Sequence, residues 1–191
     1  DVWFVVGIPI YFYAVLSDGT EAGNRAAFFM IGSFMAVWII LYGMVQASAP
    51  RILRAAQRPE GELIRAARAW ALALFVVPAV LTLAVALSPA PQTWLTVTLV
   101  AGLLVFGALF AVNSALHSYL ILAFSQSERV TMDVGFYYMA NAGGRLIGTL
   151  LSGLTYQIGG LTFVMGTAAA MVALAALTSG RLSDQSQDAA A

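Results

Sequence analysis

Apolar residues fill most of this chain in six runs, and short polar segments separate the runs. The first run is short and contains Pro9, whereas the fourth exceeds the hydrocarbon core of a bilayer at about 1.5 Å per helical residue. About 20 apolar residues predict a transmembrane helix, because a helix of that length crosses a core of about 30 Å. The predicted spans are residues 2–16, 27–49, 69–88, 93–124, 134–158 and 161–180.

Helix-breaking residues support these boundaries. Pro89 and Pro91 end the third span, because proline does not continue a helix. The pair Gly159 and Gly160 separates the fifth span from the sixth. We therefore predict an all-α integral membrane protein, with a six-transmembrane-helix bundle over residues 1–180 and a disordered cytoplasmic tail over residues 181–191.

Composition agrees with a membrane protein and excludes several kinds of chemistry. Hydrophobic residues make up 61% of the chain and charged residues 9%, and the formal net charge is zero. The chain has no cysteine, which excludes disulfides, thiolate metal sites and cysteine nucleophiles. The single histidine has no acidic partner at a usable spacing, so the sequence predicts no enzyme, no metal site and no cofactor.

Arginine supplies all nine basic residues, and its distribution predicts the orientation. Short cytoplasmic loops collect arginine and lysine, so the loop between the second and third spans is predicted to be cytoplasmic, with both ends of the chain on the same side. Only Arg25 lies in a loop on the opposite side. The loop could in principle bind nucleic acid or anionic lipid, but this rule explains it without a specific ligand of either kind. The arginines of that loop are Arg51, Arg54, Arg58, Arg65 and Arg68.

Arg145 is the most informative residue, because it lies within an otherwise uncharged stretch, residues 134–160. An arginine at the centre of a membrane helix costs about 2.5–3.5 kcal/mol, which neighbours or a ligand must offset. At 100° per residue, bulky apolar residues gather on the opposite side of the helix and polar or small residues on the side of Arg145. That side holds Tyr137, Tyr138, Asn141, Gly148, Thr149 and Ser152.

Two interpretations of Arg145 remain open at this point. It forms a hydrogen bond or an ion pair with another helix, or it contacts an anionic solute in a cavity. Small residues at Gly144, Gly148 and Ser152 repeat every four positions, which lets a helix or a solute approach the backbone closely.

Other polar residues within the spans are weaker candidates. Asn113 and His117 lie four residues apart on one side of the fourth span, where the imidazole could carry a coupling proton or contact substrate. Tyr42 and Gln46 continue a line from Trp38 on the second span. For each of these residues, packing or hydrogen bonding between helices is the structural alternative.

Six spans with both ends inside, a basic loop after the second span and a glycine-rich fifth span resemble the carboxy-terminal half of a major facilitator superfamily transporter. The loop signature of that family, Gly-x-x-x-Asp-Arg-x-Gly-Arg, aligns with residues 43–51, but only Gly43 and Arg51 match at its ends. Ala47, Ser48 and Pro50 replace its other defining residues. The resemblance implies half of a 12-helix fold, and therefore a missing amino-terminal six-helix half.

Two segments carry a finer resemblance. Asp-Val-Trp-Phe-Val-Val-Gly at the start and Val-Gly-Phe-Tyr-Tyr-Met-Ala-Asn-Ala-Gly-Gly-Arg-Leu-Ile-Gly-Thr-Leu-Leu-Ser-Gly from Val134 are similar to organoarsenical efflux permeases of bacterial arsenic operons. That resemblance implies export of the anion 1-arseno-3-phosphoglycerate across the bacterial inner membrane. It also implies a functional link to the glyceraldehyde-3-phosphate dehydrogenase that makes this anion from arsenate.

The function predicted from the sequence is secondary active efflux of an organic anion by alternating access in the lipid bilayer. The alternatives are export of another organic anion or a drug, a membrane scaffold, or a membrane enzyme. Asp1 is not an initiator methionine, so we expect the chain to begin partway through a longer protein. The candidate substrate-binding residues are Arg145, Asn141, Tyr138, Tyr137, Asn113, His117, Gln46 and Tyr42.

Overall fold

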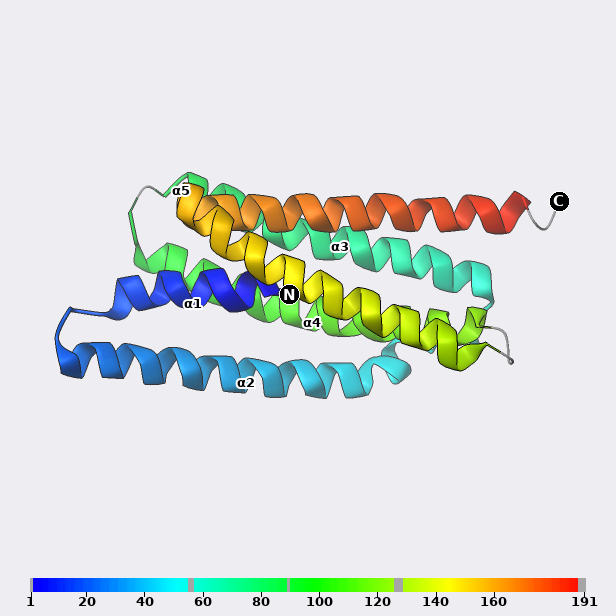
Figure 1. The fold of residues 1–191 in the computed structure, drawn as a ribbon, viewed down its shortest axis with the longest axis horizontal. Helices are drawn as coiled ribbons and strands as arrows, with labels where there is room; N and C mark the ends of the chain where they lie inside the picture. Colours follow the sequence, from blue (N-terminus) through cyan, green and yellow to red (C-terminus); the bar gives the residue numbers. More distant parts are fainter. Residues whose placement is uncertain (1, 55–56, 89, 126–128, 189–191) are drawn as a thin grey trace.

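A computed structural model describes residues 2–54, 57–88, 90–125 and 129–188, and in these residues it contains helices and turns without a β-strand (Figure 1). Four of the helices are long and apolar enough to cross a membrane, and α1 contributes a shorter apolar helix at Val6–Leu16. The architecture is therefore that of an all-helical protein consistent with embedding in a membrane. The helices are α1 (Val2–Leu16), α2 (Glu21–Leu53), α3 (Glu60–Ala86), α4 (Thr93–Phe124) and α5 (Val130–Asp188).

The longest helix, α5, consists of two helical segments that meet at a glycine pair. Gly159 has φ −148° and ψ 24°, and Gly160 has φ 61° and ψ −153°, so both leave the helical region. A positive φ is readily adopted only by glycine, which explains the residue at the second position. The chain reverses direction here, at the place where the sequence pattern separates the fifth and sixth spans (Figure 1).

Several helices extend past the apolar spans from which they were predicted. The helix α2 begins at Glu21 instead of residue 27, because Thr20 caps it: the Thr20 hydroxyl accepts a hydrogen bond of 3.0 Å from the Gly23 N–H. At the other end of the chain, α5 continues to Asp188. Residues 181–188, predicted as a disordered tail, are thus helical, since they contain neither glycine nor proline to interrupt the helix. Residues 189–191 lie outside the described residues.

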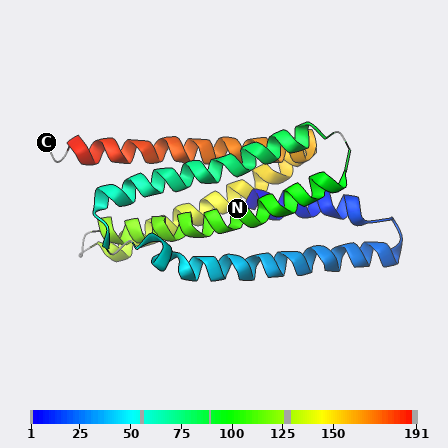
Figure 2. The same cartoon turned by 180° about the vertical axis from the view of Figure 1, so that it is seen from behind.

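Two apolar clusters hold the bundle together. Helix α4 packs against α2 and α3, while α5 packs against α3 and α1 (Figures 1 and 2). The larger cluster draws on all five helices and includes the fully buried side chains of Leu81, Leu99, Phe106 and Met165. A smaller cluster joins the last turns of α2 to the start of α3 and the second half of α4. Its buried residues are Ala49, Leu53, Leu63, Ala67, Val112 and Leu116.

Glycines on α4 allow close contact with the helices on both sides. A Cβ atom added at Gly107 would lie 2.8 Å from Trp38 Nε1, and one added at Gly102 would lie 2.7 Å from Leu81 Cδ2. Such small residues let membrane helices approach until their backbones and side chains interlock. This closeness lets the Trp38 indole N–H donate a hydrogen bond of 2.8 Å to the Leu103 carbonyl of the neighbouring helix.

Candidate functional site

Aromatic rings line the contact between α2 and α4. The Trp38 and Tyr42 rings stack at 5.8 Å, and the Tyr42 ring lies 5.9 Å from Phe110 across the interface. Phe110 in turn stacks on Phe106 at 5.8 Å with an interplanar angle of 7°. Ring pairs at these separations favour packing, so this part of the predicted stripe holds the two helices together. Tyr42 lies at the edge of this group of rings and is half-buried.

The same contacts determine the relative register of α2 and α4. Trp38 lies beside Gly107, and one turn later Tyr42 lies beside Phe110, so the two helices run in the same direction. Continuing by one more turn places the half-buried Gln46 at the level of Asn113. This register thus brings Gln46 of α2 and Asn113 of α4 to about the same depth in the bundle.

Asn113 carries a buried polar atom that no described residue satisfies. Its side-chain Oδ1 is inaccessible and has no hydrogen-bond partner, while its backbone carbonyl lies 2.8 Å from His117 Nδ1. A buried acceptor left without a donor costs about 1–3 kcal/mol. A His117 ring that donates from Nδ1 keeps Nε2 as an acceptor. The two residues therefore lie in a half-buried part of the bundle, with Asn113 Oδ1 enclosed.

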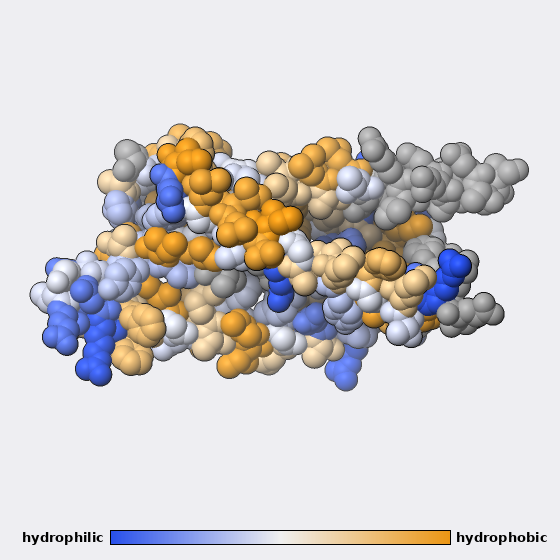
Figure 3. Space-filling view, in the orientation of Figure 1, coloured by the Kyte–Doolittle hydropathy of each residue, from blue (hydrophilic) through white to orange (hydrophobic). Residues whose placement is uncertain are grey.

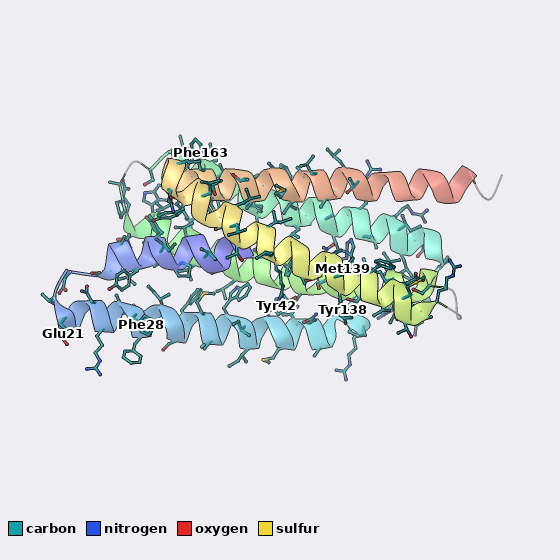
Figure 4. The ribbon with its side chains drawn as sticks, viewed as in Figure 1. Glu21, Phe28, Tyr42, Tyr138, Met139 and Phe163 are labelled. Atoms are coloured by element: carbon teal, nitrogen blue, oxygen red, sulfur yellow. The ribbon has the colours of Figure 1, made fainter. Side chains whose placement is uncertain are left out.

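The first segment of α5 separates its polar and apolar sides. Figure 4 shows Tyr138 on the side that faces α2 and Met139 on the opposite side. Both are exposed, at 65% and 63%, because neither side of this part of α5 is covered. Tyr137 is half-buried, and its ring lies 5.5 Å from that of Tyr138.

Arg145 shares the side of α5 that carries Tyr138. Seven residues are close to two full turns, so the two side chains leave the helix in nearly the same direction. Asn141 lies between them, and both Asn141 and Arg145 are exposed. Further along the same side, Gly148 and Ser152 are buried. The polar side of α5 is thus open around Arg145 and packed toward Gly159.

The eight predicted residues fall into two groups on different helices. Tyr42, Gln46, Asn113 and His117 lie on α2 and α4, and the other four lie on α5. In the view of Figure 4, Tyr42 of α2 and Tyr138 of α5 are both drawn on the sides of their helices that face each other in projection. The space-filling view shows a few hydrophilic residues in this otherwise largely hydrophobic face, and larger hydrophilic patches toward the ends of the bundle (Figure 3).

A second unsatisfied group lies on α1, outside the eight predicted site residues. The Tyr11 hydroxyl on α1 is buried without a hydrogen-bond partner among the described residues, and Tyr156 of α5 lies near it. Tyr156 continues the four-residue spacing of Gly148 and Ser152, which is the signal that could have found it.

Elsewhere, a cavity of about 210 Å³ opens between α1, α2 and α4. Its lining is apolar apart from Thr96, so it offers a polar solute little to bind. Among the residues that the structure describes, no three His, Cys, Asp or Glu side chains gather as a metal site. No protein-family model, curated protein or solved structure matches this chain.

Proposed function

We propose that the chain forms one half of a secondary transporter that exports an organic anion, with Arg145 as its principal contact. The observation that supports this proposal is the exposed polar side of α5, which carries Tyr138, Asn141 and Arg145. An exposed polar side on a helix suited to a membrane needs water, a solute or another polar helix beside it.

The residue types on this side suit an oxyanion. The planar guanidinium of Arg145 can donate two parallel hydrogen bonds to a carboxylate or a phosphate. Asn141 and Tyr138 add an amide and a hydroxyl donor one and two turns away. A bound anion would offset part of the cost of placing Arg145 within the membrane.

The α2–α4 pair would form the opposite wall of the site. Its aromatic stack provides a rigid surface, and a His117 ring that donates from Nδ1 to the Asn113 carbonyl would offer Nε2 as an acceptor for a hydroxyl group of a solute. Within this proposal, His117 is also a candidate to carry a coupling proton.

For the substrate, we propose 1-arseno-3-phosphoglycerate, supplied by a glyceraldehyde-3-phosphate dehydrogenase in a bacterial cell. This choice is supported by the resemblance of residues 134–153 to organoarsenical permeases, together with an arginine suited to carboxylate and phosphate groups. Another organic anion is the alternative with the same site chemistry. In the transporter, this bundle would rock against a second six-helix bundle in the inner membrane and expose Arg145 to either side in turn.

Uptake into everted membrane vesicles that contain the protein tests this function. Enzymatically generated 1-arseno-3-phosphoglycerate would be compared with 3-phosphoglycerate and arsenite for wild type, Arg145→Ala and Arg145→Lys. Met139→Ala is the matched control, because Met139 is equally exposed on the opposite side of α5. We expect Arg145→Ala to abolish uptake of the arsenylated ester, Arg145→Lys to reduce it and Met139→Ala to preserve it.

Two results would contradict parts of this proposal. Full uptake by Arg145→Ala, at equal protein levels, would make Arg145 a structural residue. Absence of uptake of the ester by wild-type vesicles would remove the proposed substrate, and absence of uptake for a wider set of organic anions would favour a scaffold.

A further inference from the structure

We propose that the groove where α2 ends binds the phosphate group of an anionic phospholipid. The groove has a volume of about 730 Å³ and lies between the last turn of α2, the residues after it and the second half of α4. This inference does not depend on the transport proposal. The lining residues are Pro50, Arg51, Leu53, Arg54, Gln57, Ala115 and Tyr119.

The groove combines positive charge with an apolar floor. Arg51 and Arg54 are both exposed, and no carboxylate is among the described residues that line the groove. Leu53, which is buried, and Ala115 supply apolar surface beside the two guanidinium groups. A phospholipid presents the complementary pattern, with an anionic phosphate next to an acyl chain. Arginine is suited to such a phosphate because its planar fork can donate two hydrogen bonds.

The backbone at Arg54 is strained in a way that shapes the groove. Arg54 ends α2 with φ 48° and ψ 40°, a left-handed conformation that glycine usually occupies at this position of a helix. Its N–H donates to the Pro50 carbonyl at 3.0 Å, and its own carbonyl accepts from the Gln57 N–H at 2.9 Å. These bonds turn the chain so that Gln57 joins the lining. Arginine is strained in a conformation that glycine adopts freely, which points to a role for the arginine side chain at this position.

The position of the groove along the membrane normal favours a lipid over a soluble phosphate as its ligand. Arg25 and Arg51 lie on the same helix and are about 39 Å apart at about 1.5 Å per residue. That separation exceeds the hydrocarbon core of about 30 Å and is close to the full bilayer of about 40–45 Å. Both arginines therefore fit the level of the phosphates. Tyr119 in the lining and Trp70 nearby pack on the same buried cluster, and such rings are common at this level.

Native mass spectrometry of the full chain in detergent, titrated with phosphatidylglycerol and separately with phosphatidylcholine, tests the proposal. We expect one phosphatidylglycerol to bind with higher affinity than any phosphatidylcholine. The double variant Arg51→Gln/Arg54→Gln should weaken phosphatidylglycerol binding about tenfold or more, because each basic side chain near the surface attracts anionic lipid. The matched control is Arg65→Gln/Arg68→Gln, which removes the same charge from the start of α3, outside the groove, and should keep the affinity.

Arg54→Gly separates binding from folding. Glycine suits the left-handed conformation, so this variant should melt at the same or a higher temperature than wild type while binding phosphatidylglycerol more weakly. Unchanged binding by Arg54→Gly would overturn the proposal, as would equal losses in the two double variants. Sodium phosphate and glycerol 3-phosphate form the last arm: if either binds at the same site as tightly as the lipid, the ligand is a soluble phosphate and the lipid assignment is overturned.

Discussion

The α2–α4 pair and the first segment of α5, residues 130–158, both carry polar residues on apolar helices, but they expose them differently. In the pair, Trp38 is 5% exposed and its indole N–H is bonded to the facing backbone, and Asn113 Oδ1 is buried. On α5, Tyr138 is 65% exposed. Glycines mark the same contrast, because a side chain at Gly107 would clash with Trp38, whereas one at Gly144 would meet nothing within 4 Å. Small residues therefore identify a helix contact only where a partner surface faces them.

Leucines should show the largest difference between the two regions. Leu99 on α4 is 0% exposed and Leu150 on α5 is 66% exposed. We expect Leu99→Ala to lower the free energy of unfolding by about 2–5 kcal/mol, because it leaves a cavity in the core. Leu150→Ala should change it by less than about 0.5 kcal/mol. Unfolding of the purified chain by SDS measures both, and similar losses would contradict the contrast.

Glycine substitutions should have opposite signs in the two regions. Gly107→Ala places a Cβ atom 2.8 Å from Trp38 Nε1, and we expect it to lower the free energy of unfolding by about 1–3 kcal/mol through overpacking. Gly144→Ala meets no atom within 4 Å and should raise it by up to about 1 kcal/mol, because alanine favours a helix. Thermal melting in detergent compares the two. A stabilising Gly107→Ala would show that α2 and α4 are not closely packed.

The indole hydrogen bond should contribute less than the packing around it. Trp38→Phe removes the 2.8 Å bond to the Leu103 carbonyl, and we expect a loss of about 1–2 kcal/mol in the free energy of unfolding. Trp94→Phe is the control, since the Trp94 indole bonds to Gln92 at an exposed position, and it should cost less than about 0.5 kcal/mol. If both variants melt at the same temperature as wild type, the α2–α4 contact does not depend on this hydrogen bond.

The smallest effect should come from the turn before α2. This turn offers a test of whether it, or the packing against α4, positions α2. Asp18 Oδ1 accepts bonds from the Thr20 hydroxyl at 2.7 Å and the Thr20 N–H at 2.9 Å, and these hold the pKa of Asp18 below its ordinary value. Because the folded pKa is the lower one, ionised Asp18 stabilises the turn above its unfolded pKa. That contribution disappears as the pH falls through the folded pKa.

Carbon-13 NMR of the Asp18 carboxyl group measures this shift directly. We expect it to titrate below the ordinary range for aspartate, and Thr20→Ala to raise the pKa because the hydroxyl donor is gone while the N–H remains. Global melting should change little across this titration, since Asp18 is exposed. A large change in melting would mean that the turn, and not the contact with α4, positions α2.

Parts of the candidate site were predictable because they depend on local periodicity. The expected separation of Tyr138 from Met139 needs only 100° per residue, and Figure 4 shows them on opposite sides of α5. The same rule grouped Asn113 with His117, which meet through a backbone carbonyl at 2.8 Å. It could not show that Trp38 of the α2 stripe is a buried packing residue, because that depends on Gly107 of another helix.

The sequence by itself determined the helical character, the apolar lengths of the helices, the break at Gly159 and Gly160, and the polar side of α5, since all of these follow from short-range patterns. Only the tertiary structure decided which polar groups are covered. It buries Gly148 and Ser152 while leaving Arg145 open on the same side, and it places Arg51 and Arg54 in a groove with Tyr119. The reason is that burial and cavities depend on residues distant in sequence, whose contacts are set by how whole helices pack.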